Sequence, residues 1–279
     1  MSQARPRFSL PPNASNEPLI KVSNLTIGWD DVVLQRDATF EVMRGEIFAI
    51  LGGSGCGKST LMRFMIGLET PREGTIEIQG ITGQQIGSSK PPFGVMFQSG
   101  ALLGSMTVGE NIALPLSQWT DLPDEAVEAI VQAKLRLVGL QGTEDKMPSE
   151  LSGGMKKRAA IARAMALEPS LIFLDEPSAG LDPVTAAELD DLLIALNEGL
   201  GITLVVVTHD LDSIFNIAKR CIVLDKASKS IIARGDPREL RVSDADPRVH
   251  SFFNRSSMTD AAQHEATHHD RPSMSVPPP

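Results

Sequence analysis

The stretch Ile47–Thr60, IFAILGGSGCGKST, decides the fold of this 279-residue chain. Its first five residues are apolar throughout, which is typical of a strand buried on both faces of a parallel sheet. A glycine cluster begins at Gly52, and the run STLMRFMIGL that starts at Ser59 has the character of a helix. A strand, a glycine loop and a helix in this order predict an α/β domain whose loop holds a ligand at the end of the sheet.

The glycine loop predicts phosphate binding, because Gly52–Ser59 satisfies GxxxxGK[ST]. Glycines let backbone N–H groups point at the β- and γ-phosphates, Lys58 adds a charge, and the Ser59 hydroxyl is suited to ligate Mg²⁺. The alternative, a glycine-rich turn that precedes Lys-Ser by chance, fits the flanking strand and helix less well. Cys56 is more simply a small loop residue than a redox nucleophile. The predicted ATP-binding residues of the loop are Gly52, Gly53, Ser54, Gly55, Cys56, Gly57, Lys58, Ser59 and Thr60.

Other apolar runs extend the predicted sheet. LIFLD at 171–175 and TLVVVTH at 203–209 both end in polar residues, where open α/β sheets bind ligands. LIKVSNLTIGW at 19–29 and ATFEVMRG at 38–45 alternate instead, which predicts a small antiparallel sheet. The middle of the chain, about 99–163, has helical spacing, as in DEAVEAIVQAKLRLVGL at 124–140. We expect a globular region over 18–255, a disordered leader over 1–17 and a disordered tail over 256–279, both rich in polar residues and proline.

The composition narrows the classes of partner. A net charge of −9 disfavours nucleic acid as the main partner, because phosphate backbones require clustered Lys and Arg. Two cysteines without a CxxC pair disfavour a disulfide framework and fit a reducing cytoplasm. The first 18 residues lack the apolar core of a secretory signal, and no apolar run approaches about 20 residues, so neither a signal nor a membrane span is expected. If the protein works at a membrane, we expect other subunits to cross it.

Further motifs give the chain a specific resemblance. Leu151–Met155, LSGGM, resembles the signature (LSGGQ) that defines ABC ATPases, and LIFLDE at 171–176 resembles their Walker B strand. SAGLD at 178–182 resembles the D-loop, and VMFQSG and VVVTHD resemble the Q-loop and switch-histidine segments. These motifs occur in the family's order over about 18–255. The resemblance implies a P-loop NTPase fold of the ABC nucleotide-binding type: an α/β class with a RecA-like core, an antiparallel β subdomain and an inserted helical subdomain.

The resemblance assigns catalytic and metal-binding roles to five side chains. Asp175 ends an apolar strand, where a carboxylate is costly without a cation, so with Ser59 and Gln98 it is expected to serve Mg²⁺. Glu176 is expected to act as the general base on water, and Gln98 to contact metal and water. His209 is expected to hold the γ-phosphate. Glu176 could instead be a solvated loop carboxylate, and His209 a structural hydrogen-bonder.

Trp29 stands 29 positions before Lys58, where the family usually has an aromatic residue that stacks on adenine. A Trp ring offers the π-face that such stacking needs. An ordinary core tryptophan remains the alternative.

The signature carries the strongest mechanistic implication. Ser152, Gly153 and Gly154 are predicted to open a helix, so that their amides and hydroxyl form a second anion cradle. By resemblance, this cradle faces the γ-phosphate bound to a second copy of the chain, which makes the functional unit a head-to-tail homodimer around two ATP. Asp182 is expected to communicate across the same seam. Met155 replaces the usual Gln, at a position not expected to touch phosphate.

The cargo and the membrane partners rest on finer cues. Leu102, Leu103, Met106 and Val108 follow Gln98 in a loop-like setting; they either pack within the helical subdomain or form a groove for a permease helix. SGALLGSMTVGENIALPL and the Met of the signature resemble the Mla/mammalian-cell-entry (MCE) class, which moves phospholipid or other lipid. This resemblance implies a permease, an MCE-type lipid-binding subunit and a peripheral place on the cytoplasmic face of a bacterial inner membrane. An importer of amino acids or other small solutes is the alternative, and a soluble non-transport ABC ATPase is the alternative of a different class.

HEATH at 264–268 spells the HExxH zinc-protease pattern. It lies beyond the predicted core, where no protein body could shape a site or supply a third ligand. We interpret it as coincidence in a polar tail.

Overall fold

A six-stranded sheet forms the centre of the molecule. The structure is a computed structural model that describes residues 17–29, 31–82 and 90–254. The strand order is β10-β9-β3-β8-β7-β6, parallel except for the edge strand β10. The strands are β3 (Ile47–Gly52), β6 (Gly94–Met96), β7 (Leu171–Asp175), β8 (Thr203–Val207), β9 (Arg220–Asp225) and β10 (Ser230–Gly235).

A second, antiparallel sheet has the order β2-β1-β4-β5. Its strands are β1 (Pro18–Trp29), β2 (Val32–Met43), β4 (Glu73–Ile78) and β5 (Ile81–Thr82). The predicted antiparallel sheet is therefore present, with β1 paired to β2 along nearly their whole length.

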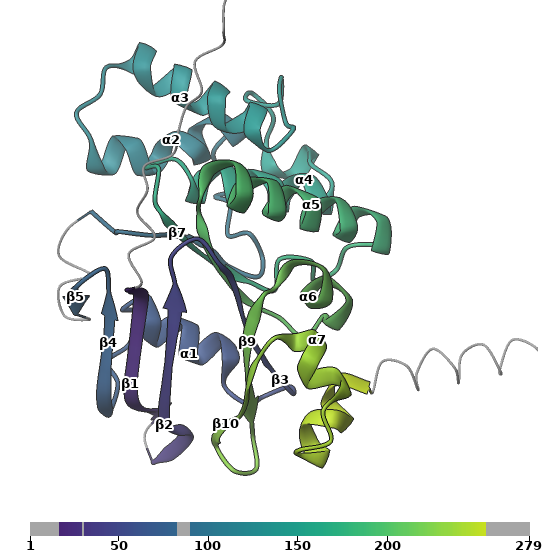
Figure 1. Ribbon diagram of the computed structural model, residues 1–279. Helices are drawn as coiled ribbons and strands as arrows, with labels where there is room; N and C mark the ends of the chain where they lie inside the picture. The colour runs from purple at the N-terminus through teal and green to yellow at the C-terminus, as the bar shows by residue number, and fades with distance from the viewer. Residues whose placement is uncertain (1–16, 30, 83–89, 255–279) are drawn as a thin grey trace, which may run out of the picture.

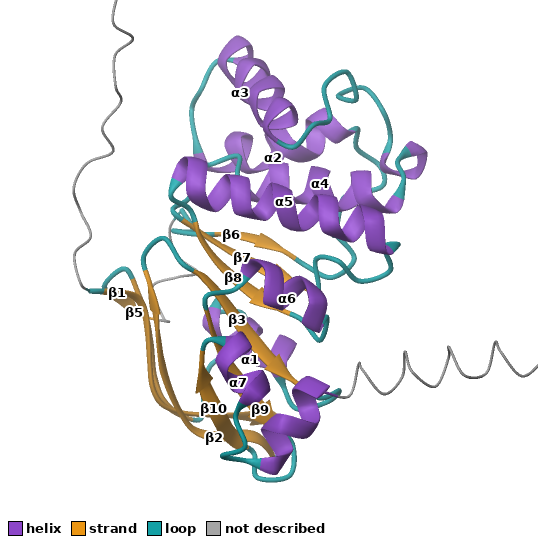
Figure 2. Cartoon of the chain, turned by 45° about the vertical axis from the view of Figure 1, so that its right-hand side comes forward, coloured by secondary structure: helices purple, strands orange, loops and turns teal. Residues whose placement is uncertain are grey.

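Helices cover both faces of the central sheet. In Figures 1 and 2, α2, α3, α4 and α5 form a layer above the sheet, whereas α1 lies on the side of β1 and β2. The helices are α1 (Lys58–Met65), α2 (Val108–Trp119), α3 (Asp124–Leu137), the 3₁₀ turn η2 (Pro148–Glu150), α4 (Gly153–Ala164), α5 (Pro183–Leu200), α6 (Leu211–Ile217) and α7 (Pro237–Val242).

Each central strand feeds two hydrophobic cores, because successive side chains point to opposite faces. Ala49 and Leu51 of β3 pack with the layer of α2–α6, whereas Phe48 and Ile50 pack with α1 and the antiparallel sheet. All six β3 residues are buried, as the unbroken apolar run predicts. The α/β fold with an antiparallel second sheet is confirmed.

The segment after Gln98 departs from the expected loop in one place. Val108 is the first residue of α2, because Thr107 caps the helix in a capping box with Glu110. It is fully buried in the hydrophobic core of the helical layer. The loop before it is held by the buried Asn111, whose side-chain amide donates to three carbonyls, including that of Leu103. For Val108 the packing interpretation is right.

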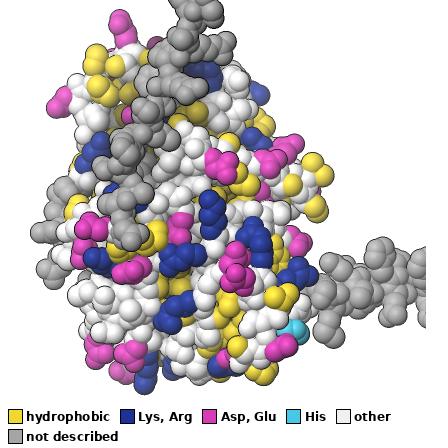
Figure 3. Space-filling view, in the orientation of Figure 1, with side chains coloured by type: hydrophobic (Ala, Val, Ile, Leu, Met, Phe, Trp, Pro, Cys, Tyr) yellow, Lys and Arg dark blue, Asp and Glu magenta, His cyan; other side chains and the backbone are white. Residues whose placement is uncertain are grey.

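The two predicted disordered ends, 1–17 and 256–279, lie outside the described residues apart from Glu17, and stay predictions. The same holds for the HExxH pattern. Over 17–29, 31–82 and 90–254, no helix has the length and apolarity needed to cross a bilayer. On the face in Figure 3, basic side chains lie interspersed with acidic ones.

Candidate active site

The glycine loop joins β3 to α1 and keeps Lys58 inside it. Gly57 precedes the helix with φ +102°, a conformation that a side chain would strain. A Cβ at Gly52 would approach the Leu224 carbonyl oxygen to 2.5 Å, so only glycine fits there. Lys58 is 8% exposed, and its ammonium donates to the Gly52 carbonyl at 2.9 Å and the Gly53 carbonyl at 3.3 Å. The loop therefore surrounds a cation at the positive end of a helix.

Cys56 is buried in this loop, and burial raises the pKa of its thiol. The reactive thiolate is thereby disfavoured, which supports the interpretation of Cys56 as a small packing residue.

Ser59 and Asp175 meet although 116 residues separate them. The Ser59 hydroxyl donates to Asp175 Oδ1 at 2.9 Å, linking the first turn of α1 to the end of β7. Asp175 is only 7% exposed, and burial raises the pKa of its carboxyl, while the bond from Ser59 opposes that rise. A buried carboxylate beside a hydroxyl is a ligand pair that suits a hard cation.

Glu176 follows with a left-handed backbone, φ +49°, held by its N–H bond to the Val207 carbonyl at 2.7 Å. Its carboxylate accepts from the Thr208 hydroxyl at 3.0 Å and contacts His209 Nδ1 at 2.8 Å. An ionised carboxylate can only accept, so Nδ1 carries the proton in this contact. The pairing of β7 with β8 thus brings the two expected catalytic side chains together, and Glu176 is not the solvated carboxylate of the alternative.

Gln98 and His209 are the exposed members of the set. The His209 ring contacts Glu176 through Nδ1, yet its side chain is 68% exposed. The rest of the ring is therefore accessible to a ligand. Gln98 follows β6, the neighbour of β7 in the sheet, and its main-chain carbonyl accepts from the Lys157 ammonium. Since both residues come after the carboxyl ends of parallel strands, they belong to the same edge as Asp175 and Glu176.

The signature residues open α4, as predicted. Ser152 is the N-cap, and its hydroxyl accepts from the Met155 N–H at 3.3 Å. Ser152 and Gly153 are exposed, whereas Met155 packs against the core. Among the described residues, no hydrogen bond joins 152–154 to the glycine loop, and α4 lies across the sheet from α1 (Figure 2). The serine cap is thus free of the loop in its own chain.

Two further expected residues occupy exposed positions. Asp182 caps α5, accepting from the Thr185 N–H at 3.1 Å and hydroxyl at 2.6 Å; these bonds lower the pKa of its carboxyl. Trp29 is 40% exposed at the end of β1, which does not fit the core alternative. Its ring lies 5.8 Å from that of Phe64 on α1, with the Arg63 guanidinium 5.9 Å from its centroid.

Two buried side chains of the site escaped sequence reasoning. Lys157 of α4 donates to the main-chain carbonyl of Glu176 at 3.1 Å as well as to that of Gln98. Gln35 of β2 is fully buried and donates to the Cys56 carbonyl at 2.8 Å, beneath the glycine loop, and to the Asp225 carbonyl at 3.2 Å. A Lys in a KK pair and a Gln in a strand carry no sequence signal for such roles.

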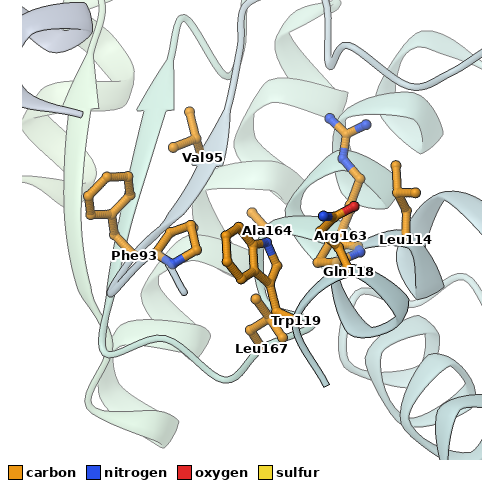
Figure 4. A pocket seen from close by; sticks show the side chains of 11 residues that line it. Phe93, Val95, Leu114, Gln118, Trp119, Arg163, Ala164 and Leu167 are labelled. Carbon is orange, nitrogen blue, oxygen red and sulfur yellow. The ribbon is translucent and has the colours of Figure 1, made fainter. Parts of the chain in front are cut away.

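A cleft of about 390 Å³ lies beside β6, between the end of α2 and the end of α4 (Figure 4). Trp119, 40% exposed, projects into it. This cleft is not the groove that the sequence offered as one alternative for Leu102, Leu103, Met106 and Val108, because none of these residues lines it. Its wall is formed by Pro91, Phe93, Gly94, Val95, Leu114, Pro115, Gln118, Trp119, Arg163, Ala164 and Leu167.

A glycine loop, two adjacent buried carboxylates and a histidine at one sheet edge define a nucleotide-hydrolysing P-loop protein. The chain belongs to the ABC transporter family, whose model matches residues 35–179, just over half of its length. It is the ATP-hydrolysing subunit of a transporter, and its recognition from the signature motif is confirmed.

Particular relatives refine this class. The chain is 39% identical to the intermembrane phospholipid transport system ATP-binding protein MlaF of Haemophilus influenzae, over 87% of this chain and 92% of that protein. It is 38% identical to the probable ribonucleotide transport ATP-binding protein mkl of Mycobacterium leprae, over 84% and 68%. The ATP-binding cassette MJ0796, solved as a dimer bound to ADP and phosphate, matches with 30% identity and TM-score 0.69, over 78% of this chain and 98% of that chain.

Proposed function

We propose that ATP is hydrolysed between two copies of this chain, and that the cycle drives phospholipid movement through a membrane permease. The observation that carries the catalytic part is the edge of the central sheet. Ser59, Asp175, Glu176 and His209 follow three different strands there and are joined pairwise by hydrogen bonds. Such convergence at the carboxyl ends of parallel strands is typical of a ligand site.

Each side chain then has a task that its surroundings permit. The loop amides and Lys58 bind the β- and γ-phosphates. Glu176, oriented by Thr208 and His209, accepts a proton from the attacking water, and Gln98 orients that water. The exposed edge of His209 contacts the γ-phosphate. Trp29 offers a partly exposed ring beside α1 for stacking on adenine.

Ser59 and Asp175, assisted by Gln98, would hold Mg²⁺, which neutralises charge on the β- and γ-oxygens when bound. The donor set fits this ion, since Mg²⁺ is usually bound through one or two protein ligands plus phosphate and water oxygens. Among the described residues, no group of three or more His, Cys, Asp or Glu could cage a metal alone. The Asp175 carboxyl is also buried enough that a cation would relieve the cost of its charge.

The second copy completes the site. The exposed Ser152 cap and the start of α4 form an anion cradle that is separate from the loop in the same chain. In a head-to-tail homodimer, this cradle faces the γ-phosphate on the partner, and Asp182 lies along the seam. The dimeric MJ0796 cassette supports this arrangement.

The transport role places the chain against a permease. We assign the cleft beside Trp119 to a short permease helix, because its wall is mainly apolar and it is open to solvent. The chain would then act peripherally, at the cytoplasmic face of a bacterial inner membrane, with an MCE-type lipid-binding subunit in the same system. MlaF's likeness over nearly its whole length favours phospholipid as the cargo, whereas mkl's name makes ribonucleotide the competing cargo.

The test is reconstitution of the complex that copurifies with a tagged copy of this chain from its native membrane. When the complex is reconstituted in vesicles, addition of ATP should cause a fluorescent phospholipid to move between donor and acceptor particles. A complex that carries Glu176→Gln should show no such movement. ATP-dependent movement of a labelled ribonucleotide without movement of phospholipid would overturn the cargo assignment.

A further inference from the structure

Lys157 is a buried cation in the signature helix that no motif explains. It lies on α4, five residues after the Ser152 cap, and is 7% exposed. Its ammonium donates to the main-chain carbonyls of Gln98 and Glu176, the latter at 3.1 Å. One side chain of the helical layer therefore touches the two segments that carry the water-orienting amide and the general base.

The position is energetically expensive, which argues that more than space filling keeps it. Transfer of an ammonium group out of water is unfavourable, and burial lowers the pKa of Lys157. The nearby carboxylates of Glu176 and Asp175 oppose that shift. A side chain that only filled this volume could be apolar at no such cost.

A second cation strengthens the link between α4 and the segment after β6. Arg163, near the end of α4, donates to the Gly100 carbonyl at 2.9 Å and the Ala101 carbonyl at 2.7 Å. Together, Lys157 and Arg163 hold both ends of the 98–101 segment against the same helix. Only Lys157 also reaches the end of β7, at Glu176.

We infer that Lys157 is a positioning residue for hydrolysis: it fixes the backbones of Gln98 and Glu176 to the helix that begins at Ser152. This rests on the proposed roles of those residues. In the proposed dimer, the Ser152 cap faces the nucleotide bound to the partner. When that nucleotide moves α4, Lys157 transmits the movement to Glu176 of the same chain, which acts on the nucleotide bound to this chain. Among the described residues, the Lys157 ammonium donates only to the main-chain carbonyls of Gln98 and Glu176 and to no residue of the glycine loop. Its loss should therefore affect the chemical step rather than nucleotide binding.

The test compares steady-state ATPase kinetics of full-length variants. Lys157→Met removes the donors and should lower kcat by about 100-fold, the effect of displacing a reacting group by about 1 Å, while KM for ATP changes less than about threefold. Lys156→Met removes the same charge from the neighbouring, half-buried lysine and should keep wild-type kcat. Lys157→Arg, which keeps a cation with several donors, should recover at least about tenfold over Lys157→Met.

Thermal unfolding of each variant checks that the fold survives. If Lys157→Met does not fold, Lys157→Gln, which retains one donor group, takes its place in the same comparison. Unchanged kcat in the folded variant, an equal loss in Lys156→Met, no recovery in Lys157→Arg, or a loss confined to KM would each overturn the inference. A Glu176→Gln variant measured alongside distinguishes a failure of the proposed function from a failure of this inference. A normal kcat in Glu176→Gln would refute the proposed role of Glu176 itself, whatever Lys157→Met does.

Discussion

Replacing the Glu176 carboxylate by an amide is the sharpest perturbation of the site. Glu176→Gln keeps the shape of a side chain that is 7% exposed, and its amide oxygen can still accept from the Thr208 hydroxyl. The amide NH₂ can donate to His209 Nδ1 once the ring proton moves to Nε2. The fold and both contacts therefore survive, and what is lost is the capacity to take a proton from water.

The size of the effect follows from that single loss. General base catalysis contributes about 10²- to 10⁴-fold, so kcat should fall by that factor, equivalent to about 2.7–5.4 kcal/mol in the barrier. Binding of ATP should persist, because Lys58 and the glycine loop lie on another strand end. An ATP complex that cannot turn over should accumulate as a dimer.

The assays are phosphate release and size-exclusion chromatography with ATP. Glu188→Gln makes the same chemical change at an exposed carboxylate paired with Arg158, and should leave kcat within about twofold, as exposed ion pairs contribute little. A Glu176→Gln variant that stays monomeric with ATP while hydrolysing it at the wild-type rate would refute the assigned role.

Four further outcomes are expected. Lys58→Ala should abolish ATP binding in calorimetry, because the loop loses its only side-chain ammonium. Ser152→Arg should inactivate the site on the partner, so that mixed dimers of Ser152→Arg with Lys58→Ala keep one intact site, whereas either homodimer keeps none. Burial raises the pKa of Asp175 above 3.8, so the stability that its protonated carboxyl contributes is lost as pH rises through the folded pKa. Asp175→Asn should therefore stabilise the nucleotide-free chain at pH 7 by about 0.5–2 kcal/mol in urea titration. The same variant should lose the stabilisation that Mg-ATP gives. Trp119→Ser should weaken permease copurification while leaving ATP binding unchanged.

Much of the fold could be predicted because the central strands are apolar runs. β7 was predicted with its bounds, and β8 with its start, since burial on both faces removes the ambiguity of a half-exposed strand. The capping serine of α4 was equally readable. The start of α2 was missed at Val108, because a short loop tied down by Asn111 looks in sequence like a longer one.

The contacts within the site were less accessible to sequence reasoning. That Glu176 meets His209 depends on which strands are neighbours, and apolar runs do not encode strand order. Lys157 belongs to a KK pair on a helix, where solvation is the ordinary expectation; only the packing of α4 against the ends of β6 and β7 buries one lysine of the two. Trp29 shows the reverse case, since its partial exposure could not be read from residue type.

The buried amide of Gln35 has a consequence for any shortened form of the chain. Every letter of the phosphate-binding motif lies after Ile47, so a fragment starting there would look complete on paper. Yet the Cys56 carbonyl accepts a hydrogen bond from Gln35 of β2, and the same amide also donates to the carbonyl of Asp225, the last residue of β9. A fragment without β1 and β2 would keep every residue of the motif but lose the hydrogen bond from Gln35 to the Cys56 carbonyl. Such a fragment should bind triphosphate more weakly.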